Sequence, residues 1–218
     1  STTTNLDCLR PVRPGHASQT LTSGTRRFQL HPMPLTDFLS MPVPRGVPGR
    51  RPFIKMHGLR NYFVFIEQRY GNLSLPPAEI IRICDAHEGV GAEQVIAIEA
   101  PSAEGLRHGA YAFMRIHNID GTEAEACGNA TRCMAHLMFE ESGRDTLLIE
   151  TLGGLLQCAK GDRAQVSVTL GPIRTDWQSV PLAHDADTAH LPISCGPLKD
   201  GVALSLGNPH VVFFVPDF

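Results

Sequence analysis

One stretch of the chain repeats its apolar residues with a helical period. Between residues 128 and 142 the intervals are three and four residues, which places these side chains on one face of an α-helix. The positions are Ala130, Cys133, Met134, Leu137 and Met138. Gly143 follows directly, and glycine at that place favours the left-handed residue that ends many helices. The pattern therefore predicts a helix over Gly128–Ser142.

A shorter helix and several strands are predicted around it. The helix covers Pro77–His87, with Ile80, Ile81, Ile83 and Cys84 on its apolar side. Short apolar runs between turn residues are typical of strands, and they occur at Asn61–Ile66, Gln94–Ile98, Ala110–Ile116, Leu147–Thr151, Leu155–Ala159, Ala164–Leu170, Val202–Leu206 and Val211–Val215. The run from His210 to Val215 is apolar enough to predict a buried strand with partners on both sides. Strands outnumber helices, and the predicted fold class is α+β.

Residues 1–53 follow neither pattern. They are rich in Pro, Ser, Thr and Arg, with few acidic residues and no apolar period. This composition predicts a disordered extension. It also resembles an organellar transit peptide, and a stretch translated from a misplaced upstream start is a third explanation. We expect ordered structure to begin near Phe53.

Composition narrows the classes of function. The 218 residues are 42% hydrophobic and 19% charged, which is typical of a globular protein. The net charge of -3 gives no sign of a nucleic-acid or membrane partner, and no apolar run approaches the ~20 residues that span a bilayer. The six cysteines are expected to be reduced, because no secretory signal is visible. Their spacing also predicts no metal site.

Candidate chemistry lies around Cys127. Before it, a predicted strand ends near His117 and the turn residues 118–121 (Asn-Ile-Asp-Gly) follow; after it, the long helix begins. The free N–H groups at a helix start favour negative charge. They are expected to lower the pKa of a thiol there and to hold a substrate carboxylate. The alternative is that Cys127 is a small buried apolar residue.

This segment resembles the signature of diaminopimelate epimerases, in which an Asn-x-Asp-Gly turn leads to Cys-Gly-Asn and then to Arg-Cys. Four more stretches resemble family landmarks and occur in the family's order: 55–63 (KMHGLRNYF), 84–94 (CDAHEGVGAEQ), 149–154 (IETLGG) and 207–210 (GNPH). The likeness runs from about Ile54 to the C-terminus.

The resemblance implies an architecture and a reaction. Family members have two similar lobes of mixed strands, each wrapped around a central helix. Here residues 54–171 would form the first lobe and residues 172–218 an incomplete start of the second. The family converts LL-diaminopimelate to the meso form, for lysine biosynthesis, with two cysteines and with neither metal nor pyridoxal phosphate. A cytoplasmic enzyme with a small-molecule substrate is therefore expected, and a homodimer is left open.

The resemblance also assigns roles by position. Cys127 falls at one of the two catalytic cysteines, and His210 falls where the family has a residue thought to adjust the cysteine pKa. Substrate-binding positions are Asn61, Gln94, Asn118, Gly128, Asn129 and Asn208. Taken singly, several of these residues have ordinary explanations as turn or strand-edge residues.

Three departures from the family pattern leave alternatives open. Arg60 stands at a usual glycine and would strain a left-handed turn, and Tyr62 stands at a usual aspartate. The Cys-Gly-Ser/Thr-Gly stretch with the partner cysteine is absent, so the chain alone is expected not to epimerise. Another racemase of the same architecture, a phenazine-pathway-like isomerase or a degenerate non-catalytic fragment remain alternatives. A thiol hydrolase using Cys127 and His210 is weaker, because no third orienting group is identifiable.

Overall fold

The computed structural model describes residues 53–71, 75–162 and 165–216, together with the backbone of β1 (Thr22–Ser23) and β2 (Arg26–Arg27), which pair antiparallel. The rest of the predicted disordered extension lies outside the described residues. The chain divides into two compact units, a first unit of Ser1–Thr169 and a second unit of Leu170–Phe218.

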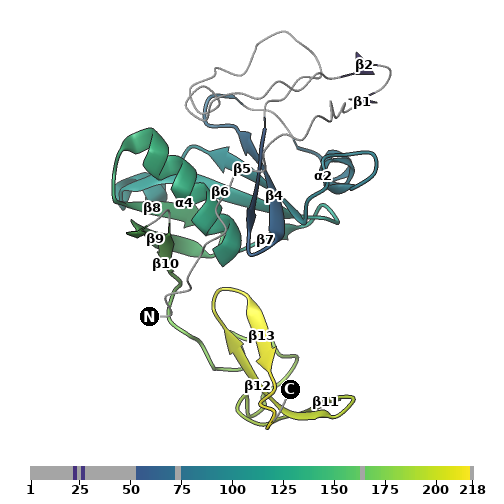
Figure 1. The fold of residues 1–218 in the computed structure, drawn as a ribbon. Coiled ribbons are helices and arrows are strands. Elements are labelled where there is room, and N and C mark those ends of the chain that lie inside the picture. The colour runs from purple at the N-terminus through teal and green to yellow at the C-terminus, as the bar shows by residue number, and fades with distance from the viewer. Residues whose placement is uncertain (1–21, 24–25, 28–52, 72–74, 163–164, 217–218) are drawn as a thin grey trace. The chain divides into compact units, whose positions relative to one another are not determined.

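The first unit contains one mixed sheet of eight strands (Figure 1). The strand order is β10-β9-β8-β6-β5-β4-β3, and the short β7 pairs with β6. The strands are β3 (Ile54–Gly58), β4 (Asn61–Glu67), β5 (Gln94–Glu99), β6 (Ala110–Asn118), β7 (Glu123–Ala124), β8 (Thr146–Thr151), β9 (Gly154–Lys160) and β10 (Val166–Thr169). The helices are α2 (Pro77–Cys84), α3 (Ala103–Arg107) and α4 (Gly128–Ser142).

Two strand pairs are parallel, β4 with β5 and β6 with β8. A parallel pair needs a crossover connection, and α2 and α4 lie in these two connections. Successive side chains of a strand point to opposite faces. In β4, accordingly, Phe63 and Phe65 belong to the core cluster that includes α4, whereas Val64 and Ile66 pack in the cluster that includes α2.

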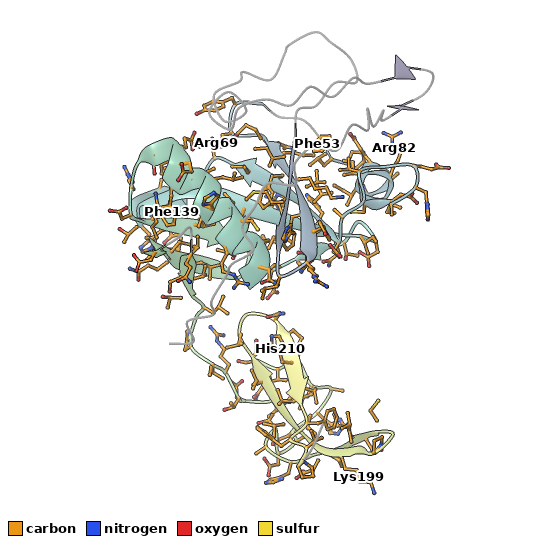
Figure 2. The ribbon with its side chains drawn as sticks, viewed as in Figure 1. Phe53, Arg69, Arg82, Phe139, Lys199 and His210 are labelled. Atoms are coloured by element: carbon orange, nitrogen blue, oxygen red, sulfur yellow. The ribbon has the colours of Figure 1, made fainter. Side chains whose placement is uncertain are left out.

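The sheet curls around α4. This helix contacts β3 and β10, the two ends of the strand order, and also β6, β8 and β9 between them (Figure 1). Its buried side includes Phe139, which is labelled in Figure 2. The predicted bounds of this helix are confirmed. The predicted cap is confirmed too, because Gly143 has a φ of 67° and its N–H bonds to the carbonyl of Phe139.

The predicted helix over Pro77–His87 is too long. It ends at Cys84, because the carboxylate of Asp85 accepts hydrogen bonds from the backbone N–H groups of His87 and Glu88 and so turns the chain. Ile81 was expected on the buried side, but this residue is 49% exposed. The short α3 was not predicted.

The second unit is a three-stranded antiparallel sheet in the order β11-β12-β13. Its strands are β11 (Leu191–Cys195), β12 (Leu198–Ser205) and β13 (Pro209–Val212). The strand predicted over Val211–Val215 overlaps β13, but β13 ends earlier and is not buried, so the prediction of burial is wrong. Within the described residues β13 pairs with β12 alone, and Phe214 beyond its end is 80% exposed. In the described part of the chain no helix has the length and apolar character that a membrane span requires.

Candidate active site

Three of the predicted substrate-binding residues lie together at one end of the sheet. Asn61 begins β4, Gln94 begins β5 and Asn118 ends β6. Because β4 and β5 are parallel and β5 and β6 antiparallel, these ends coincide, and Gln94 pairs directly with Asn118. They line a pocket of about 550 Å³ together with Leu59, Arg60, Glu93, Ile119 and Asp120.

The amide groups leave hydrogen-bond acceptors unused in this pocket. Gln94 Nε2 donates to Asn118 Oδ1 at 2.9 Å, and Asn118 Nδ2 donates to Thr122 Oγ1 at 3.1 Å. Gln94 Oε1 and Asn61 Oδ1 are both buried without a hydrogen-bond partner. A buried acceptor without a partner costs about 1–3 kcal/mol. A ligand that brings donor groups to these two oxygens would recover that free energy.

The turn after β6 fixes Asn118. The N–H of Gly121 donates to the carbonyl of Asn118 at 2.9 Å, and the Thr122 hydroxyl donates to the Asp120 carboxylate at 2.6 Å. Gly121 has a φ of 83°, and a Cβ there would lie 2.7 Å from the Cβ of Pro77. Only glycine fits this conformation and this space without strain.

The turn between β3 and β4 is strained at the position where the sequence predicted strain. Leu59 has a φ of 55° and Arg60 a φ of 68°, a pair of conformations that two-residue hairpin turns usually reserve for residues such as Asn-Gly. The strand before the turn comes close to α4, because a Cβ on Gly58 would lie 3.3 Å from the Cβ of Asn129. The turn therefore connects the pocket with the start of α4.

Cys127 is the residue that precedes α4. It is extended, with a φ of -149° and a ψ of 105°, and its side chain is half-buried against the core. Its carbonyl accepts hydrogen bonds from both the N–H and the hydroxyl of the fully buried Thr131, each at 2.9 Å. The segment just before it is supported by Gly153, whose N–H donates to the carbonyl of Glu125 at 3.0 Å. The thiol thus has a fixed backbone and remains partly accessible.

The prediction of a lowered pKa for Cys127 is wrong. Burial raises the pKa of this thiol above its ordinary value, and this cause outweighs the others. The backbone N–H groups of Ala130 and Asn129 and the charge of Arg132 act in the opposite direction. Burial thus has a larger effect than the helix start, which stabilises the thiolate less than the sequence suggested.

The remaining predicted residues lie in two places. Gly128 and Asn129 form the first turn of α4, directly after Cys127. Asn208 and His210 lie in the second unit, in and after the turn between β12 and β13, and Figure 2 labels His210 there. His210 Nε2 is hydrogen-bonded to Asn208 Oδ1 at 3.0 Å. These two side chains therefore act as a local pair in their own unit.

Sequence reasoning missed the residues that support Cys127. Thr131 and Gly153 hold the backbone on its two sides, and Gly58 allows the close approach of β3 to Asn129. The described cysteines are all free thiols. Within the described residues no cluster of three His, Cys, Asp or Glu side chains could hold a metal ion.

Comparison with known proteins identifies the family. The sequence model of the diaminopimelate epimerase family matches residues 53–175, which is more than half of the chain. The chain belongs to the diaminopimelate epimerase family. It is 47% identical to the diaminopimelate epimerase of Rhodospirillum centenum over 168 residues, which cover 77% of this chain and 56% of that protein. Identity to the enzyme of Acidiphilium cryptum is 47% over 167 residues, covering 77% of this chain and 58% of the relative. The chain thus spans somewhat more than half the length of these relatives.

Solved structures support the same architecture. A hydroxyproline epimerase from Agrobacterium vitis matches with a TM-score of 0.52 and 12% identity, over 73% of this chain and 50% of that one. A probable proline racemase from Agrobacterium radiobacter matches with a TM-score of 0.50 and 13% identity, over 73% and 50%. These matches confirm the predicted α+β lobe of mixed strands around a helix. At such identities they show the fold alone.

Proposed function

We propose that this chain carries one of the two proton-transferring cysteines of a diaminopimelate epimerase, which converts LL-diaminopimelate to the meso form. The observation that carries the proposal is the position of Cys127, half-buried at the start of α4 within the segment that matches the family. The relatives named as diaminopimelate epimerases support the choice of substrate.

The proposed reaction moves one proton off the α-carbon and another onto it. A cysteine thiolate takes the α-proton, so that the Cα–H bond breaks and an S–H bond forms. A thiol on the opposite face then gives its proton to the carbanion. The N–H groups of Gly128 and Asn129 at the start of α4 would stabilise the negative charge that develops on the adjacent carboxylate. The raised pKa of Cys127 keeps its proton in place at neutral pH, which suits the role of proton donor.

The remaining roles follow the positions of the side chains. Asn61, Gln94 and Asn118 would bind the substrate from the pocket of the first unit. By their positions in the family motif, Asn208 is proposed as a further substrate-binding residue and His210 as a residue that adjusts a cysteine pKa. We also propose that the protein works in the cytoplasm in lysine biosynthesis, without a cofactor. The Cys-Gly-Ser/Thr-Gly motif is absent from these 218 residues. The 218 residues by themselves therefore lack the second proton-transferring cysteine.

Protection of Cys127 from alkylation tests substrate binding. The 218-residue chain is treated with limiting iodoacetamide with and without diaminopimelate, and labelling is followed by peptide mass spectrometry. Diaminopimelate is expected to slow the labelling of Cys127, because the bound substrate would cover its sulfur. The exposed Cys195 of the second unit serves as the internal reference, and its labelling should not change. Equal labelling of Cys127 at every substrate concentration would contradict the proposal.

An activity assay tests the proposal that the chain has only one of the two proton-transferring cysteines. Purified protein is incubated with LL-diaminopimelate, and the meso isomer is measured by chiral chromatography. No meso isomer should form above the level given by the Cys127→Ala variant, because only one proton-transferring cysteine is present. Robust epimerisation by the unmodified chain would disprove the claim that a second proton-transferring cysteine is absent, and would leave the assignment of the substrate intact.

A further inference from the structure

Arg60 is an unpaired cation at the pocket of the first unit. Of the described residues that line this pocket, Arg60 is the sole basic one. Its side chain is exposed, and the structure gives it neither an ion pair nor a hydrogen bond among the described residues. An arginine in this position presents its planar array of N–H donors to whatever enters the pocket.

The backbone conformation of Arg60 is energetically unfavourable. A φ of 68° is a left-handed conformation, and it costs a residue with a Cβ about 1–2 kcal/mol that glycine avoids. The neighbouring Leu59 has the same type of conformation. Strain of this kind is often found where a side chain serves a binding site, and it motivates a search for the role of that side chain.

Several hydrogen-bond acceptors line the same pocket. Asn61 Oδ1 and Gln94 Oε1 are buried acceptors without partners. The carboxylates of Glu93 and Asp120 also line the pocket; the first accepts the N–H of Tyr62 and the second accepts from Thr122. A ligand that fits this arrangement offers an ammonium group to the oxygens and an anionic group to Arg60.

We propose that Arg60 is a specificity-determining residue, whose guanidinium binds a carboxylate of an amino-acid ligand while Asn61 Oδ1 and Gln94 Oε1 accept hydrogen bonds from its ammonium group. The inference rests on the proposed function for the substrate class and adds a contact that a glycine at this position cannot make. Guanidinium–carboxylate pairs can form two parallel N–H···O bonds, which gives them direction as well as strength.

Paired variants and paired ligands test this contact in the 218-residue chain. Arg60→Gln removes the charge and Arg60→Lys retains it, and both keep a side chain in the left-handed conformation. Binding of diaminopimelate is compared with binding of 1,5-diaminopentane, which has both amines and neither carboxylate, by calorimetry or NMR titration. Arg107→Gln is the matched control, because Arg107 is exposed on α3, which precedes the opposite end of β6.

The expected result is selective. Arg60→Gln should weaken diaminopimelate binding about tenfold, as for loss of one charged hydrogen-bonded contact, and should leave diaminopentane binding unchanged or tighter. Arg60→Lys keeps the charge but loses the two parallel N–H···O bonds, so its affinity should lie between that of the unmodified chain and that of Arg60→Gln. Arg107→Gln should bind like the unmodified chain. Equal affinity of Arg60→Gln and the unmodified chain for diaminopimelate would overturn the inference, while protection of Cys127 would still support the proposed function. Absence of diaminopimelate binding to the unmodified chain would overturn both.

Discussion

Cys127 is subject to two opposing influences. Burial favours the neutral thiol, while the N–H groups of the first turn of α4 and the charge of Arg132 favour the thiolate. Burial is the largest of these causes, so the pKa is raised. Arg132 is itself partly buried, its pKa is lowered by burial, and its Nε has no hydrogen-bond partner. A partly buried guanidinium acts on nearby charges more strongly than one in water.

The reactivity of Cys127 should therefore shift to high pH and should depend on Arg132. Alkylation requires the thiolate, so its rate at Cys127 should still be rising at a pH where the rate of a free thiol has levelled off. Arg132→Gln removes a charge that lowers the pKa, and should slow alkylation at pH 8 by a few-fold; Arg132→Lys should not. Rates are measured by mass spectrometry between pH 7 and 10, with glutathione as the reference thiol. A profile that levels off before that of glutathione would contradict the raised pKa.

At the scale of elements, the β3–β4 turn is where the described residues of the first unit other than glycine adopt positive φ angles. Leu59 and Arg60 both have positive φ, and the 48% exposed Leu59 has little packing to lose. The double substitution Leu59→Asn with Arg60→Gly should raise the free energy of unfolding by about 1–2 kcal/mol, because Asn-Gly suits a hairpin turn with positive φ. Urea denaturation measures the change.

Gly121 provides the opposite case. Gly121→Ala should destabilise the chain, because its φ is 83° and the new Cβ would meet Pro77. If neither the Asn-Gly turn nor Gly121→Ala changed the free energy of unfolding, backbone conformation would not limit stability at this end of the sheet.

The bounds of an element could be predicted where nearby residues determine them, and not where the rest of the fold does. The bounds of α4 followed from its apolar period and from Gly143, since both act within the helix. The end of α2 was missed because Asp85 competes for the backbone N–H groups beyond Cys84. The apolar run near Val211 predicted burial, but whether a strand has partners on both sides is a tertiary property that composition does not contain.

The candidate site, too, was predictable only in part. Asn61, Gln94 and Asn118 were each expected to bind substrate, and the register of β4, β5 and β6 brings them to one pocket. The raised pKa of Cys127 was not predictable, because burial depends on the whole sheet around α4. The support from Thr131 and Gly153 was missed because neither residue type signals such a role.

At the scale of the whole molecule, the two units differ in the size of their cores. The first unit has two clusters of buried residues, one on each face of its sheet. The core of the second unit consists of the buried Val180, Leu191 and Ala203, with two partly buried neighbours. Because the burial of apolar surface provides most of the stabilising free energy of folding, the second unit should have much the lower local stability.

Hydrogen exchange of the 218-residue chain should resolve this difference. Amides in β5 and β6 should exchange only through global opening of the first unit, because both strands are hydrogen-bonded on both sides within a large core. Amides in β12 should exchange at least about a hundredfold faster, although β12 is also the central strand of its sheet. Using a central strand in both units removes edge position as an explanation and leaves core size as the cause. Equal protection of β12 and β5 in mass-spectrometric exchange would show that the second unit is stabilised by something other than its own small core.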